Sequence, residues 1–266
     1  MATLWHPDYV IQNWHQYLMY VAIVWLAAGV NIFGSQLIPL YNKCVRKSSP
    51  RRLPEEQAFA NAHEVYLMMI SLFATFVTIL ACARGRYQSA SWVFTDTTNS
   101  TGWSSNGFAF VLAVMNGVFS FLGIDCGAHL AEEIPNPGKN VPRVIMWPIL
   151  IDFITAWPFA IACCAAITSV ADVLSGEVTG FPLLTIYYQA TGSKAGATVL
   201  LALFTICFFG CVTACFTTCS RTLWAVSRDG ALPYSQYWQQ VSKRFQMPVK
   251  ASVLSATVMS VSQWKV

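Results

Sequence analysis

Residues 117–137 read GVFSFLGIDCGAHLAEEIPNP. The stretch begins as the end of an apolar block, yet Asp125 places an ionisable group inside it and three glycines loosen a helix there, at 117, 123 and 127. Backbone that unwinds at membrane depth is tolerated only where protein or a water-filled cavity surrounds it. The pattern therefore predicts a helix that is broken near Gly123 and Asp125 and that binds a polar ligand at the break.

Beyond the break, polar side chains continue at helical spacing. Ionisable residues occupy positions i, i+4, i+7 and i+8 of one helix face, namely Asp125, His129, Glu132 and Glu133. Pro135 and Pro137 then end the helix. The His-x-x-Glu-Glu pattern could hold a metal ion or act as general acid and base. The chain has no second cluster of this kind, no nucleophile elbow and no P-loop, so we expect no enzyme activity, no metal and no cofactor.

The composition indicates which solvent surrounds the chain. Of 266 residues, 55% are hydrophobic and 11% are charged, and the mean hydropathy is +0.49. About a quarter of the residues of a soluble domain are charged. This composition excludes a secreted disulfide scaffold, a coiled coil and a disordered tail. Long charge-poor blocks separated by short polar stretches predict an all-α, polytopic transmembrane helix bundle.

The apolar blocks predict the membrane spans. A bilayer core about 30 Å thick requires about 20 helical residues. Blocks near this length lie at 17–40, 65–83, 108–133, 144–171 and 195–220, and a sixth, 251–266, stops with the chain as an interrupted helix. The third block crosses the bilayer only if it continues through the break. The first 16 residues contain no Lys or Arg and no apolar core, so we expect no signal peptide and an anchoring first span.

Lys and Arg predict the orientation of the spans. Twelve of them lie in the alternate connections 41–60, 132–143 and 221–250, whereas the opposite connections carry three, at Arg84, Arg86 and Lys194. The positive-inside rule places the twelve in the cytosol and the N-terminal tail outside. The sequon Asn99-Ser100-Thr101 falls in a loop assigned to the outside. We expect a multi-pass protein of the plasma membrane and no nucleic-acid partner.

Four of the nine cysteines repeat every fourth residue, at 207, 211, 215 and 219. They spread over about 18 Å of one helix, whereas a metal site draws its ligands from more than one element. We interpret them as small, polarisable residues that pack between helices.

Two segments resemble one transporter family. The string Phe121-Leu-Gly-Ile-Asp125, followed by Glu132-Glu-Ile-Pro-Asn-Pro137 and by Pro142, looks like the sixth transmembrane helix and the following loop of the amino acid-polyamine-organocation transporters. Residues 220–233, SRTLWAVSRDGALP, are similar to the end of the eighth helix of that family and its cytosolic loop. Shorter segments resemble fungal permeases for amino acids, choline and γ-aminobutyrate, at 14–18, 104–110, 181–182 and 188–193.

The resemblance implies a fold of about twelve helices with two inverted repeats of five, in which the broken first and sixth helices form the substrate site. The present chain would cover the fourth helix to part of the ninth. The glycine motif of the first helix, which in the family helps to bind the substrate carboxylate, is missing. The resemblance therefore implies either a fragment or a chain that needs a complementary chain.

Within this family, the unwound stretch that faces the substrate would consist of Phe121, Leu122, Gly123 and Ile124. Backbone groups are the expected contacts, and the ring of Phe119 or Phe121 could cover a quaternary ammonium group by cation–π attraction. Three roles remain open for Asp125. It could balance a cationic substrate, exchange a coupling proton, or cap the half-helix that follows.

Further charged residues are assigned to a gate or to coupling. Glu132 and Glu133 lie at a helix C-terminus, where the helix dipole disfavours them, so cytosolic cations must compensate. Arg143 and Arg221 are the candidates for a gate or a structural ion pair.

Asp152 lies nine residues beyond Arg143, inside its span, between Pro148 and Pro158. It forms either a structural polar bridge or a site of proton coupling. The hydroxyls of Thr217, Thr218 and Ser220 could lie near an ion site.

The resulting functional hypothesis is that the chain transports a substrate without making or breaking any of its covalent bonds. The chain is predicted to be a truncated copy of an ion-coupled secondary permease for a small amino acid or amine, with choline and γ-aminobutyrate among the candidates. Its partners are the substrate, the lipid bilayer and a coupling proton. The alternative is a structural or regulatory membrane protein that does not transport and that associates with a full-length permease.

Overall fold

The computed structural model describes residues 1–6, 12–45, 53–96, 99, 102–121, 123–129, 131, 135–175, 180–242, 245 and 247–263. Within these ranges every regular element is a helix, and no strand occurs. In the same residues, three helical stretches are long and apolar enough to cross a membrane: Asn13–Phe33, Pro137–Ala166 and Lys194–Arg228. Shorter apolar helices cover Tyr66–Cys82, Asn106–Met115 and Val249–Ser262. The prediction of an all-α transmembrane fold is confirmed, and the exact limits of each span in the membrane remain predictions.

The chain divides into two compact units. Unit 1 consists of Met1–Asp8 and Phe73–Ala202, and unit 2 consists of Tyr9–Leu72 and Leu203–Val266. Two long helices, α3 (Leu53–Cys82) and α10 (Lys194–Arg228), contribute residues to both units.

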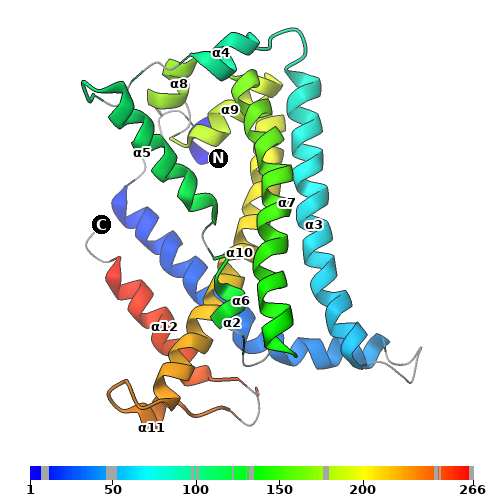
Figure 1. Ribbon diagram of the computed structural model, residues 1–266, viewed down its shortest axis with the longest axis vertical. Helices are drawn as coiled ribbons and strands as arrows, with labels where there is room; N and C mark the ends of the chain where they lie inside the picture. Colours follow the sequence, from blue (N-terminus) through cyan, green and yellow to red (C-terminus); the bar gives the residue numbers. More distant parts are fainter. Residues whose placement is uncertain are drawn as a thin grey trace. The chain divides into compact units, whose positions relative to one another are not determined.

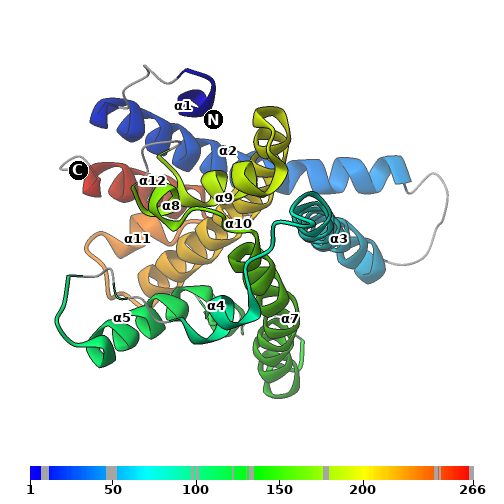
Figure 2. The same cartoon turned by 90° about the horizontal axis from the view of Figure 1, so that it is seen from above.

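Unit 1 contains the break and the helices around it, of which α4 to α9 are labelled in Figure 1 and α1 in Figure 2. Its complete helices are α1 (Ala2–Trp5), α4 (Ala90–Thr95), α5 (Asn106–Val118), η2 (Phe119–Phe121), α6 (Cys126–His129), α7 (Pro137–Ala166), α8 (Val170–Ser175) and α9 (Pro182–Thr191). Side-chain caps mark where some of them begin. The hydroxyl of Ser105 accepts the N–H of Phe108 at 3.4 Å at the start of α5, and that of Ser89 accepts the N–H of Trp92 at 3.3 Å at the start of α4.

The limits of α7 differ from those of the predicted block 144–171. The helix begins at Pro137, where a missing N–H costs nothing. It ends at Ala166, because the backbone turns extended at Ile167. The side chain of Gln189 then accepts the N–H groups of Thr168 and Ser169 at 2.9 and 3.3 Å. Two helical hydrogen bonds are thus replaced by contacts from a distant residue.

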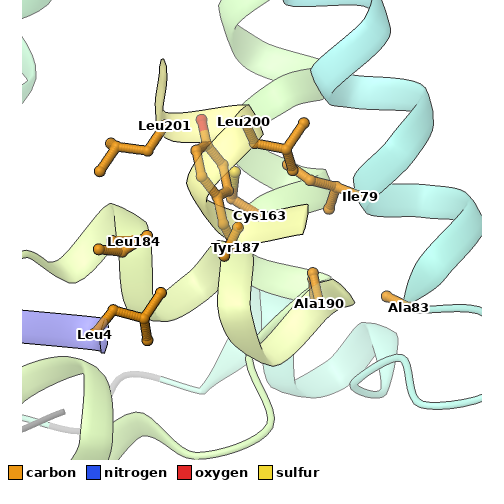
Figure 3. Close-up of a cluster of buried hydrophobic side chains, with 11 residues drawn as sticks. Leu4, Ile79, Ala83, Cys163, Leu184, Tyr187, Ala190, Leu200 and Leu201 are labelled. Carbon is orange, nitrogen blue, oxygen red and sulfur yellow. The ribbon is translucent and has the colours of Figure 1, made fainter. Parts of the chain in front are cut away.

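A buried cluster lies where α1, α3, α7, α9 and α10 meet in unit 1, and Figure 3 shows its side chains. The exposed fraction is 1% or less for Ile79, Leu184, Tyr187, Ala190 and Ala197. The ring of Tyr187 is the largest of these fully buried side chains. Its phenol is away from water, and desolvation raises the pKa of Tyr187, with a smaller contribution from Cys163.

Unit 2 is built on the pairing of α2 (Asn13–Val45) with α12 (Val249–Ser262), which lie side by side in Figures 1 and 2. Val24 and Ala28 of α2 pack with Phe216 of α10 and Ala256 of α12. The small side chains of Ala28 and Ala256 suit close packing of helices, as is common in membranes. The hydroxyl of Tyr20 also donates to the carbonyl of Met259 at 3.4 Å.

Candidate functional site

The predicted break is present in unit 1. Helix α5 ends at Val118 and continues only as the short η2, and four-residue α6 begins at Cys126. Gly123 has φ +87°, a left-handed conformation that glycine adopts without the clash of a side chain. The interruption is therefore stabilised by the residue type that the sequence places there.

The residues assigned to substrate binding lie around this turn. Phe121 has an exposed fraction of 45%, Gly123 and Ile124 are half-buried, and Asp125 is exposed. Leu122, and the side chain of Phe119, lie outside the described residues. The carbonyl of Phe121 accepts the N–H of Ile124 at 3.4 Å, and that of Gly123 accepts the N–H of Cys126 at 3.0 Å. These two carbonyls already have partners, and contact of the segment with a substrate stays a prediction.

Asp125 has a partner that the sequence reasoning missed. Its Oδ2 lies 3.1 Å from Nε2 of His129, one helical turn further along, and the two side chains are 68% and 46% exposed. The carbonyl of Asp125 also accepts the N–H groups of Ala128 and His129, which starts α6. The i, i+4 spacing was the available signal. The pair places a carboxylate and an imidazole together on the exposed side of the break, where both are accessible to a cationic ligand or a proton.

Helix α6 is positioned by a close approach to α7. A Cβ atom at Gly127 would lie 2.7 Å from Cγ1 and 3.5 Å from Cβ of Val144. Real Cβ atoms do not approach another atom that closely, so a larger residue at this position requires α6, α7 or the side chain of Val144 to move. The polar half-helix is thus packed directly on the first turns of α7.

The described structure does not test the pairing of the residues assigned to the gate. Arg143 is exposed on α7 in unit 1, and Arg221 is half-buried on α10 in unit 2. Glu132 and Glu133 lie outside the described residues. Their pairing stays a prediction.

Asp152 is half-buried in α7, between Pro148 and Pro158 as the sequence shows. The hydroxyl of Thr155 reaches the carbonyl of Asp152 at 3.4 Å and that of Ile151 at 2.8 Å. These are backbone contacts, so they leave the role of the carboxylate as predicted, either a polar bridge or a coupling site.

Unit 2 contains a polar contact that the sequence reasoning did not identify. Nδ2 of Asn31 in α2 donates to the carbonyl of Thr213 in α10 at 3.1 Å, and Oδ1 of Asn31 accepts from the hydroxyl of Thr217. An amide in an otherwise uncharged span was the available signal, because it needs partners inside the bilayer. The hydroxyl of Thr217 thus bridges two helices, and the ion site suggested for it stays a prediction.

We expect Asn31→Leu to lower the free energy of unfolding by about 1–2 kcal/mol, because it removes the contacts to α10 and leaves Thr217 with fewer partners. Denaturation of the purified chain in detergent micelles, followed by helical circular dichroism, would measure this change. Thr257→Val is the matched control, since the hydroxyl of Thr257 is exposed and bonds only within its own helix among the described contacts. If Asn31→Leu lowered the free energy of unfolding no more than the control does, the contact of Asn31 with Thr213 and Thr217 would not stabilise unit 2.

The cysteine stripe lies on the surface of α10. Cys211, Cys215 and Cys219 are exposed and Cys207 is half-buried. The interpretation that the stripe packs between helices stays a prediction. No group of three His, Cys, Asp or Glu side chains in the described residues has the spacing of a metal site.

Comparisons of the amino-acid sequence with known proteins find relatives of the chain. A sequence model of the family described as amino acid permease matches residues 58–262. The chain is 33% identical over 96% of its length to a choline transporter of Saccharomyces cerevisiae, and 28% identical over 96% of its length to a transmembrane transporter of Metarhizium robertsii. It is 33% identical over 64% of its length to an amino-acid permease of Arabidopsis thaliana. The matches cover 42%, 46% and 34% of these relatives, so the chain spans less than half the length of each.

Proposed function

The chain belongs to the amino acid permease family, and we propose that it forms the part of a secondary permease that contains the broken substrate-binding helix. The proposed cargo is a small amino acid or amine, moved by alternating access and coupled to an ion. The observation that carries this proposal is the interruption between α5 and α6 inside an apolar, multi-helix chain. Half-helix ends near the bilayer midplane are where transporters of this kind bind their substrates.

The chemistry of the break supports a cationic or zwitterionic cargo. Asp125 and His129 place an acidic and a basic group at one end of the gap, and Phe121 presents an exposed ring at the other. An aromatic face attracts a quaternary ammonium group by about 0.5–2 kcal/mol. A relative named as a choline transporter makes choline the first substrate to test.

Residues of the gate and of coupling are part of the same proposal. Glu132 or Glu133 pairs with Arg143 or Arg221 when the cytosolic side is closed, while Asp125 and Asp152 are the candidates for exchange of a coupling proton. The chain spans 42% of the length of the relative named as a choline transporter, so the experiment below supplies the N-terminal half of that relative as a second chain.

Uptake of labelled choline and amino acids tests the proposal in cells that express the chain alone or with the N-terminal half of the Saccharomyces cerevisiae choline transporter. We expect uptake above background only with both chains, and at least a tenfold loss in Asp125→Asn, equivalent to about 1.4 kcal/mol or more. In the same cells, reversing the charge of Glu132 should impair uptake, and reversing Arg221 as well should restore part of it.

The matched control is Asp172→Asn, which makes the same change in exposed α8, away from the break. It should change uptake by less than about twofold, since surface substitutions have small effects. Absence of uptake with both chains, when each is present in the membrane, would reject transport and favour the alternative, a structural or regulatory membrane protein associated with a full-length permease.

The proposed orientation places the N-terminal tail and the 84–106 loop outside the plasma membrane and the basic connections in the cytosol. We expect a single N-linked glycan on Asn99, seen as a shift in electrophoretic mobility that an endoglycosidase removes and that Asn99→Gln abolishes. The amide of Asn99 donates to the carbonyl of Trp103 at 2.7 Å and to Oδ1 of Asn106 at 3.2 Å, and a glycan on this nitrogen would replace one of these two contacts. A chain that is glycosylated only after a sequon is introduced between residues 229 and 248 would have the opposite orientation.

A further inference from the structure

The connection between α10 and α12 is a folded platform, drawn in orange in Figure 1 around α11 (Ser235–Trp238). Nε1 of Trp224, near the end of α10, donates to the carbonyl of Gln239 at 2.9 Å. Nε1 of Trp238 donates to the carbonyl of Pro233 at 3.1 Å. Both indole groups thus hold the backbone of the connection in place, and the aromatic rings have fixed positions beside the end of an apolar helix.

Two cations are held on aromatic rings of this platform. Nζ of Lys250, in the first turn of α12, lies 3.6 Å from the ring centre of Tyr237 and donates to Oε1 of Gln240 at 2.7 Å. Cζ of Arg228, at the end of α10, lies 5.3 Å from the ring centre of Trp224. The two positive groups are therefore each oriented by an aromatic ring, one at the end of α10 and one within the connection.

The charge of the connection is strongly unbalanced. Residues 221–250 contain five cations, Arg221, Arg228, Lys243, Arg244 and Lys250, against the single carboxylate of Asp229, and five minus one leaves a net charge of +4. Asp229 lies 3.6 Å from Nε of Arg228 and offsets part of that charge. Lys250 has no such neighbour among the described ion pairs, so it is the stronger anion-binding group.

Exposed aromatic and apolar side chains accompany these cations. The exposed fraction is 83% for Tyr234, 50% for Tyr237 and 47% for Val241. Trp and Tyr gather where a membrane meets water, because one end of each side chain is apolar and the other polar. Cations directly beside such residues, at the end of a membrane helix, lie at the depth of lipid headgroups.

We propose that the connection between α10 and α12 is a binding surface for anionic phospholipid headgroups, with Lys250 as the principal phosphate contact and Arg228 as the second. An ammonium group has three N–H donors. Gln240 takes one and the face of Tyr237 covers another direction, which leaves a donor for a phosphate oxygen. Basic clusters just beyond a membrane helix bind anionic lipids in this way. The inference is independent of transport.

Native mass spectrometry of the whole chain in detergent micelles tests this surface, by titration with phosphatidylserine and with phosphatidylcholine of the same acyl chains. We expect phosphatidylserine to bind at least tenfold more tightly. Lys250→Gln should weaken its binding roughly fivefold, and Arg228→Gln by less than that. Tyr237→Phe keeps the ring and should retain the affinity, whereas Tyr237→Leu should lower it about two- to fivefold.

Lys194→Gln is the matched control, because it removes one exposed cation at the opposite end of α10. It should change the phosphatidylserine affinity by less than twofold. Helical circular dichroism identifies any variant that fails to fold, and a second variant, Lys250→Arg, should then retain binding. The proposal would be overturned if the two lipids bound equally, or if Lys194→Gln weakened phosphatidylserine binding as much as Lys250→Gln does. Stronger binding of hexaglutamate than of phosphatidylserine would also overturn it, because that result assigns the surface to an acidic protein.

Discussion

Replacing Tyr187 by alanine is expected to lower the free energy of unfolding by about 3–5 kcal/mol. The ring is 1% exposed and lies among Ile79, Cys163 and Leu200, which belong to three other helices of unit 1 (Figure 3). Removing it leaves a cavity that these side chains can fill only in part, because they are held by long helices. Denaturation of the purified chain in detergent micelles, followed by helical circular dichroism, would measure the loss.

Two controls separate burial from chemistry at this position. Tyr66→Ala makes the same substitution at a side chain that is 63% exposed, and we expect it to change the free energy of unfolding by less than about 1 kcal/mol. Tyr187→Phe keeps the ring and should cost far less than alanine. Similar losses for the two alanine variants would show that the cluster does not hold unit 1 together.

The buried phenol also predicts a dependence on pH. Burial raises the pKa of Tyr187, so the folded chain keeps a proton that the unfolded chain loses above about pH 10. The contribution to stability is complete below that value and is lost as the pH rises further toward the folded pKa. Tyr187→Phe should reduce the loss of stability in this range.

Replacing Gly127 by alanine is expected to destabilise the chain by about 1–3 kcal/mol and to displace the polar half-helix α6. The added carbon would lie 2.7 Å from Cγ1 of Val144. Valine is stiff at χ1 in a helix, so either α6 or α7 must move. Detergent denaturation would measure the stability, and uptake with the complementary chain should fall at least tenfold, because the carboxylate of Asp125 moves with α6.

A second substitution and a matched control test this explanation. Val144→Ala removes Cγ1 and should restore most of the stability and uptake lost in Gly127→Ala. Gly117→Ala makes the same change in α5, where no atom lies within 4 Å of the new Cβ, and it should be neutral or stabilising by up to about 1 kcal/mol. Additive damage from Gly127→Ala and Val144→Ala would indicate that the two residues do not contact each other.

Several features of the candidate site could be read from residue types alone. The interruption near Gly123 followed from glycines and a carboxylate inside an apolar block, and the structure confirms it with a φ of +87°. The contact between Asp125 and His129 could be identified only from the structure. Their spacing places the two side chains on one helix face, but it does not decide which atoms come into contact. Roles in binding, gating and coupling remain predictions, since each needs a partner from another helix.

The contacts between helices could not be predicted from the pattern of residues along the sequence. Asn31 stood in an uncharged span as a polar residue in need of partners, and only the packing of α2 on α10 identified Thr213 and Thr217 as those partners. The early end of α7 at Ala166 depends in the same way on Gln189, more than twenty residues further along the chain. Periodicity describes one helix at a time, whereas these contacts are made between helices.

The amino-acid sequence by itself determined that the chain lies in a bilayer, that it is helical and where its helix is broken. Hydropathy and charge spacing act through transfer to the bilayer, and glycine placement acts through local backbone energetics. Tertiary structure alone decided that Gly127 packs against Val144, that Tyr187 lies in the buried cluster of unit 1 and that Lys250 lies against the ring of Tyr237. These contacts join residues whose separation along the chain carries no periodic signal, so they depend on how whole helices fill the space between them.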